Sequence, residues 1–179
     1  LVAALLLIVS AFSSFITASF GIGGGGVMLA VLASLLPPAA IIPVHGVVQL
    51  GSNTGRAALF VRYTQWQVFW PFVIGSIIGV LIGGMTVVQL HPGWLQIAVG
   101  VFILWTVVGK PPAFLRKWGA VSGAFSSFLS MFIGGTGPFV AAYVRAQGYD
   151  RHAYVGTHAT LMTVQHGLKV LMFGFLGFA

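Results

Sequence analysis

Long uncharged stretches alternate with short polar connections along this chain. Their lengths and spacing predict helices, each bounded to within several residues, at 1–20, 26–36, 39–60, 68–90, 94–108, 117–133, 138–147 and 152–178. The stretches 1–20 and 68–90 match the roughly 20 apolar residues that cross a bilayer. By contrast, 26–36 and 138–147 are short, and each comes after glycines. The pattern predicts an all-α, polytopic membrane protein of about seven or eight helical segments.

The chain contains the same pattern twice. The stretch AFSSF at 11–15 recurs at 124–128, and the match continues without a gap at an offset of 113 residues. Pairs at this offset include Gly21 and Gly134, Gly24 and Gly137, Val31 and Val144, His45 and His158, Arg56 and Lys169, and Phe60 and Phe173. Internal repeats in an apolar chain are typical of secondary transporters, which hold a substrate between two related halves. Five predicted crossings separate the starts of the copies, so we expect two inverted repeats.

The two copies of the repeat are followed by different lengths of chain. We divide the single membrane domain into 1–116, the first repeat with its adjoining helices, and 117–179, the second repeat. The stretch 61–108 comes after the first repeat, whereas the sequence stops just after the equivalent point of the second. We therefore expect the second repeat to be incomplete, as in a fragment or a shortened paralogue.

Composition and charge agree with a membrane location. Hydrophobic residues make up 58% of the chain, charged residues 5%, and the mean hydropathy is +1.03, whereas soluble domains carry about 25% charged residues. If every helix crosses, the basic connections lie on one face, which should be cytoplasmic. They contain Arg62, then Lys110, Arg116 and Lys117, then Arg145 and Arg151. The net charge of +7 thus indicates topology, and we expect no nucleic-acid partner.

A polar stripe runs along one face of the third predicted helix and recurs in the second repeat. In the first copy it consists of His45, Gln49, Ser52, Asn53 and Arg56, and in the second of His158, Met162, Gln165, His166 and Lys169. The spacings of four, three, one and three residues put each set on a single helical face. Polar groups in hydrocarbon cost several kcal/mol each, so they should face protein or a water-filled pathway.

The chemistry of the stripe favours an anion. Hydrogen-bond donors dominate, and the single acidic residue, Asp150, lies outside the predicted helices. Sodium and proton sites in membranes usually rely on carboxylates. We therefore predict a pathway for a small oxyanion. In the alternative, Arg56 and Lys169 reach toward the membrane surface, and the histidines only form packing hydrogen bonds.

The two glycine segments support the same prediction. Each precedes a short helix, so free backbone N–H groups and the positive end of the helix dipole can point at an anion. The candidate contacts are Gly23, Gly24 and Gly25 in the first copy and Gly135, Thr136 and Gly137 in the second. Glycines also permit close helix packing and hinges, which is the alternative interpretation.

These motifs resemble a known family. Gly21-Ile22-Gly23-Gly24-Gly25 and Gly134-Gly135-Thr136-Gly137-Pro138 are similar to the two glycine-rich signatures of the sulfite exporter TauE/SafE family, also called toluene sulfonate uptake permeases. The chain has Ala30 where members usually carry a proline, and members are longer. The resemblance implies a multi-pass carrier of the bacterial inner membrane that often exports sulfite, sulfonates or related anions. It implies no enzymatic activity and no cofactor.

Other functions stay open at this stage. A soft metal ion is the first alternative cargo, with His45, His158, His166 and Met162 as ligands. A non-transporting fragment or assembly subunit is the second. An intramembrane enzyme is a poor match, because no nucleophile with a base and an orienting acid is visible. The expected partners are a small anion and the lipid bilayer, together with further copies of the chain if it forms a homo-oligomer.

Overall fold

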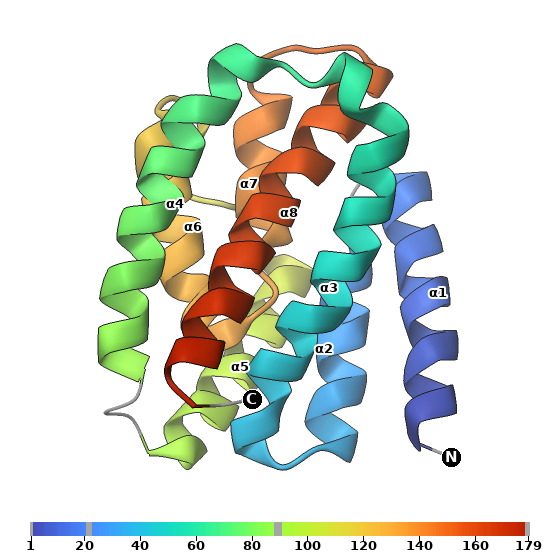
Figure 1. Ribbon diagram of the computed structural model, residues 1–179, viewed down its shortest axis with the longest axis vertical. Coiled ribbons are helices and arrows are strands. Elements are labelled where there is room, and N and C mark those ends of the chain that lie inside the picture. Colours follow the sequence, from blue (N-terminus) through green and yellow to red (C-terminus); the bar gives the residue numbers. More distant parts are fainter. Residues whose placement is uncertain (1, 21–22, 88–90, 178–179) are drawn as a thin grey trace.

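In the computed structural model of the protein, residues 2–20, 23–87 and 91–177 are described, and they form a bundle of helices (Figure 1). The helices are α1 (Val2–Phe20), α2 (Gly24–Leu35), α3 (Pro38–Phe60), α4 (Trp66–Val87), α5 (Pro92–Val108), α6 (Gly119–Ile133), α7 (Gly137–Arg145) and α8 (Arg151–Phe175). Two short 3-10 turns, η1 (Val61–Tyr63) and η2 (Ala113–Arg116), were not predicted. The described residues contain no strand. The all-α prediction is confirmed, and each expected helix is present.

The outer surface of the bundle is apolar. Among the described residues, α4 is the helix that is long and apolar enough to cross a membrane by itself, with 22 residues and a mean hydropathy of 2.1. Shorter apolar segments lie in α1, α2, α5 and α6. Large apolar side chains point outward, among them Leu7, Phe12, Ile74, Met85 and Leu104. Such a surface suits lipid, and the protein is a polytopic membrane protein as predicted.

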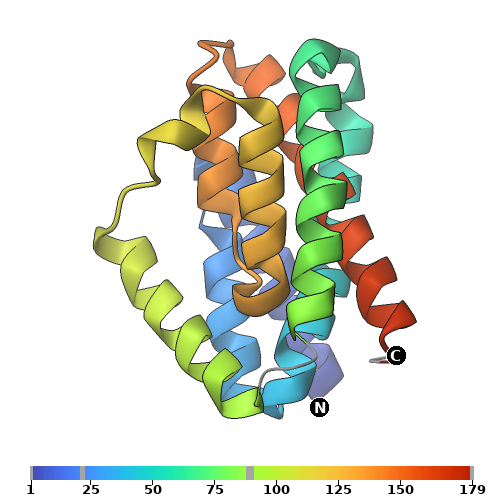
Figure 2. The ribbon, with the colours of Figure 1, turned by 90° about the vertical axis from the view of Figure 1, so that its left-hand side faces the viewer.

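The two repeats are inverted. Helices α1 and α6, α2 and α7, and α3 and α8 occupy equivalent places in the two copies, and the members of each pair run in opposite directions (Figures 1 and 2). The α3–α4, α5–α6 and α7–α8 connections all lie toward one end of the bundle. These connections hold the basic residues that were expected on one face, and we call this the basic end.

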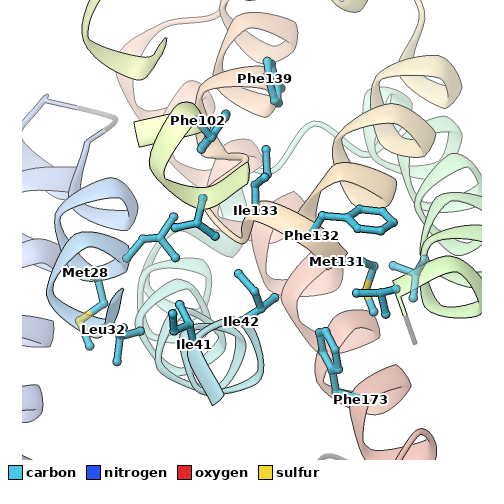
Figure 3. Packing of buried hydrophobic residues seen from close by; sticks show 14 of the residues in the cluster. Met28, Leu32, Ile41, Ile42, Phe102, Met131, Phe132, Ile133, Phe139 and Phe173 are labelled. Carbon is cyan, nitrogen blue, oxygen red and sulfur yellow. The ribbon is translucent and has the colours of Figure 1, made fainter. Parts of the chain in front are cut away.

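A smaller apolar cluster lies around Phe69, Phe72, Val140 and Tyr143 near the basic end. The larger apolar core lies between α2, the start of α3 and the final turns of α6 and α8, and it extends to α5, η2 and α7 (Figure 3). Its buried members include Met28, Leu32, Ile41, Ile42, Met131, Phe132, Ile133 and Phe173. Burial of these side chains holds the N-terminal half of the chain against the second repeat.

Close backbone packing joins α4 to α6. A Cβ added to Gly75 would overlap the carbonyl oxygen of Ala120, and one added to Gly79 would overlap that of Ala124. From the other side, a Cβ on Gly123 would overlap the carbonyl oxygen of Phe72. Small residues that allow helix backbones to approach are a common packing device in membranes.

Gly75→Ala is expected to lower the melting temperature of the detergent-solubilised protein. The added methyl group must push α4 away from α6, and overpacking of this kind costs about 1–3 kcal/mol. Gly100→Ala on α5 is the matched control, because a Cβ there meets nothing within 4 Å. Equal melting temperatures for the two variants would contradict the close α4–α6 contact.

Candidate functional site

A cavity of about 130 Å³ lies between the two repeats. Its walls come from α1, α2, α3, α5, α7 and α8, with α3 of the first copy facing α8 of the second. The lining residues are Thr17, Gly23, Gly25, Gly26, His45, Gln49, Asn53, Arg56, Thr106, Gly135, Gly137, Pro138, His158, Met162 and His166. The inverted repeat thus places duplicated polar positions around one small space.

The polar stripe of α3 forms an ordered hydrogen-bond chain. Nδ2 of Asn53 donates to the backbone carbonyl of Gln49 at 2.6 Å, and Oδ1 of Asn53 accepts from Nη2 of Arg56, also at 2.6 Å. Asn53 therefore fixes one edge of the guanidinium group. Nε of Arg56 is buried and has no hydrogen-bond partner within residues 2–20, 23–87 and 91–177. The guanidinium group keeps donor capacity for a further ligand.

Three buried histidines lie around the same cavity. Nε2 of His45 donates to the carbonyl oxygen of Gly25 at 3.0 Å, so its unpartnered Nδ1 is the acceptor of that tautomer. Nδ1 of His166 and Nε2 of His158 also lack partners among the described residues. His158 hydrogen-bonds to the backbone of Gly137. Buried polar atoms are normally satisfied, so several unsatisfied ones around one cavity make it the candidate binding site.

The glycine segments meet in the middle of the molecule. Helices α2 and α7 both begin there and run to opposite ends of the bundle (Figures 1 and 2). A Cβ added to Gly135 would lie 4.0 Å from the carbonyl oxygen of Gly25. Gly23 and Gly134 have φ angles of 110° and 75°, which favour glycine and allow the abrupt turns into these short helices. The positive ends of two helix dipoles therefore face one cavity.

Most of the predicted site residues line this cavity. The ten that do so are Gly23, Gly25, His45, Gln49, Asn53, Arg56, Gly135, Gly137, His158 and His166. Of the glycines quoted with the first signature, Gly21 lies outside the described residues, as does Ile22.

Four predicted residues lie behind the wall instead. The backbone N–H of Gly24 donates to Oγ1 of Thr17 at 3.1 Å, which ties α2 to α1. Thr136 donates to Oε1 of Gln165 at 3.4 Å, and Nε2 of Gln165 donates to Oγ of Ser127 at 3.1 Å. These two side chains connect α7, α8 and α6. The polar stripe of α8 is wider than the arc that faces the cavity, so part of it contacts α6.

Lys169 is the fourth residue behind the wall. Its side chain is fully buried, and Nζ donates to the carbonyl oxygen of Gly134 at 3.4 Å. Its aliphatic part packs on α3, where a Cβ added to Gly46 would lie 3.1 Å from Cε of Lys169. The single acidic residue, Asp150, accepts hydrogen bonds from the N–H groups of His152 and Ala153 and so caps α8. Lys169 thus holds the glycine segment and has no acidic partner.

The cavity also has lining residues that sequence analysis missed as anion contacts. They are Thr17, Gly26, Thr106, Pro138 and Met162. Thr17 could have been predicted from the repeat, because its partner at the 113-residue offset is Ser130, which is also polar. Thr106 could not be predicted in this way, because it belongs to α5, which lies outside the stretches that match at this offset.

The histidines do not gather as a metal centre. In the described part of the chain, no three His, Asp or Glu side chains lie close enough together to hold a metal ion. The rings of His45 and His166 have centroids 5.8 Å apart and contact each other edge to face. The arrangement is that of two packed imidazoles beside a cavity.

Comparison with known proteins gives one result. Neither the curated proteins nor the solved structures contain a match to this chain. A family model described as "Sulfite exporter TauE/SafE" matches residues 6–179. Since that match covers nearly the whole chain, the protein belongs to the sulfite exporter TauE/SafE family.

Proposed function

We propose that the protein carries sulfite, or a sulfonate or similar small sulfur-containing anion, across the bacterial inner membrane as a secondary exporter. Membership of a sulfite exporter family makes it an integral membrane transporter. The observation that supports an anionic cargo most directly is the cavity itself. Arg56 lines it together with neutral hydrogen-bonding groups, and no carboxylate of the described residues lines it.

The electrostatics of the cavity favour an anion over a cation. A buried charge is costly unless another charge or a set of hydrogen bonds compensates it. Arg56 donates to the neutral amide of Asn53, and Asp150 is engaged at the start of α8. An oxyanion in the cavity would supply the missing negative charge, and guanidinium groups bind such anions with paired hydrogen bonds.

The size of the cavity favours a small cargo. Its volume of about 130 Å³ lies well below the roughly 300–1,000 Å³ of pockets for drug-sized ligands, and well above the roughly 10–15 Å³ that one water molecule needs. A partly hydrated three-oxygen anion is in this range. A larger sulfonate would need the cavity to widen.

The orientation of the protein is inferred from its charges. Basic connections of membrane proteins collect on the cytoplasmic side, so we place the basic end in the cytoplasm. The cavity between 1–116 and 117–179 then lies near the middle of the membrane, where transporters with inverted repeats bind their substrates.

Radiolabelled sulfite flux in proteoliposomes tests the proposal. The purified chain is expected to give saturable sulfite uptake that a short-chain sulfonate reduces by competition, above the leak of protein-free liposomes. Absence of sulfite and sulfonate flux, with folded protein confirmed by circular dichroism, would contradict it. Uptake of nickel or copper ions without sulfite uptake would support the metal alternative instead.

A further inference from the structure

A second cavity, of about 430 Å³, lies on the side of the site that faces the basic end. It is bounded by the last turn of α5, the α5–α6 connection and α7. Its lining residues are Trp105, Thr106, Gly109, Pro111, Arg116, Pro138, Ala141, Ala142, Arg145 and Ala146. We call it the outer cavity, and the site described above the inner cavity. Thr106 and Pro138 line both, so the two cavities adjoin at these residues.

The repeat explains how the outer cavity arises. At the 113-residue offset, Met28, Leu29 and Leu32 of α2 correspond to Ala141, Ala142 and Arg145 of α7. The three side chains of α2 are 0% exposed and belong to the apolar core. In α7, two of these positions carry alanine and the third carries an exposed arginine. The second copy thus opens a space where the first copy packs large apolar side chains.

The outer cavity is also positively charged. Arg116 of η2 and Arg145 of α7 line it, and no acidic residue in the described part of the chain does. The guanidinium carbon of Arg145 lies 5.5 Å from the ring centroid of Tyr154, a contact that orients the arginine at the end of α7. A cleft lined by one sign of charge concentrates ions of the opposite sign.

Apolar side chains are buried toward both ends of the molecule. One cluster is the core of Figure 3, and a second lies around Phe69, Phe72, Val140 and Tyr143 near the basic end. The outer cavity lies near the basic end and shares Thr106 and Pro138 with the inner cavity. A path from the basic end to the inner cavity would pass these two residues.

We propose that the outer cavity is a second anion-binding site, in which Arg116 and Arg145 capture the sulfur oxyanion before it passes Thr106 and Pro138 into the inner cavity. This proposal rests on the proposed function of the inner cavity. The proposal gives Arg116 and Arg145 a role beyond membrane topology. Lys117 and Arg151 lie at the same end but line neither cavity, so they are expected to have no such role.

Sulfite uptake into inside-out membrane vesicles tests the capture site, because the cytoplasmic end then faces the medium. The double variant Arg116→Gln/Arg145→Gln is expected to raise KM for sulfite about tenfold at low salt, with Vmax close to wild type. The difference from wild type should shrink as ionic strength rises. Lys117→Gln/Arg151→Gln removes the same charge from exposed positions at the same end and should keep the wild-type KM.

The outcomes separate the two proposals. No sulfite uptake by the wild-type chain means that the proposed function fails. Wild-type uptake with equal KM values for the two double variants overturns the capture site alone, because the arginines then act only as surface charge or not at all. Ala142→Leu copies the equivalent residue of α2 into the outer cavity and is expected to lower sulfite uptake below that of wild type, because the larger side chain narrows the path past Thr106 and Pro138. Wild-type uptake by Ala142→Leu would also overturn the capture site.

Discussion

Arg56→Gln is expected to abolish sulfite flux while the protein still folds. Arg56 is the guanidinium group on the inner cavity, and its Nε has no partner among the described residues. Removing one charged hydrogen bond to the cargo costs about 1.5–3 kcal/mol, which corresponds to a roughly 10- to 150-fold loss of flux at low sulfite. Loss of the positive charge adds to this, because the anion would then enter a cavity without a counter-charge. Glutamine can keep a hydrogen bond to Asn53, so the helix should be preserved.

The measurement is sulfite uptake into proteoliposomes, with circular dichroism and melting temperature as tests of folding. Arg62→Gln is the control, because Arg62 is an exposed residue of the adjacent 3-10 turn and lies over the ring of Tyr63. We expect wild-type flux from Arg62→Gln and a partial recovery from Arg56→Lys, which keeps the charge but not the paired donors. Wild-type flux from folded Arg56→Gln would show that the cargo does not use this cavity.

The sequence allowed the helices to be predicted because their physical causes are local. Uncharged stretches bounded by glycine, proline or basic residues located each α-helix of the described residues within a few residues of its observed ends. Inversion of the repeats was predicted by counting the crossings between the copies. The 3-10 turns at Val61–Tyr63 and Ala113–Arg116 were missed because such short turns leave no periodic pattern.

The spacing of the polar stripes predicted most of the residues that face the cavity, but not every contact of each stripe. On α3, the stripe residues from His45 to Arg56 line the cavity except Ser52, whose hydroxyl oxygen lies 2.6 Å from that of Ser14 on α1. The α8 stripe divides between two neighbours, so His158 and His166 line the cavity whereas Gln165 contacts Ser127 of α6. Periodicity defines a face but not the element that packs against it. Which element packs against a given face depends on how the helices assemble.

The outer cavity is a feature that the internal repeat did not predict. Matching residues revealed the duplication, but a structural difference between the copies lies in positions that do not match, such as Leu29 and Ala142. Leu29 of α2 is packed in the apolar core, whereas Ala142 of α7 lines the outer cavity. A duplicated fold can therefore give two equivalent helices different surroundings.

Lys169→Met is expected to stabilise the fold and to lose transport. The amino group of Lys169 is fully buried, and its single protein partner among the described residues is the carbonyl oxygen of Gly134, at the long distance of 3.4 Å. Replacing buried ionic groups with apolar side chains of similar size often stabilises proteins by about 1–4 kcal/mol. Methionine keeps much of the volume against Gly46, so the melting temperature should rise by roughly 2–15 °C.

The expected loss of flux has a structural cause of its own. Gly134 has a positive φ angle and begins the turn into α7, whose first residues line the inner cavity. Without the hydrogen bond from Lys169, this segment loses the contact that fixes its carbonyl group. A loss of about tenfold at low sulfite is expected from one such bond.

Melting temperature and sulfite flux, measured on the same preparation, test this prediction. Lys110→Met removes an exposed lysine and should change neither quantity. A lower melting temperature for Lys169→Met would mean that the lysine is retained for stability, and wild-type flux would mean that it does not support the site. A higher melting temperature with lost flux would instead identify Lys169 as a buried group that the fold keeps at a cost in stability, because the glycine segment needs it in place.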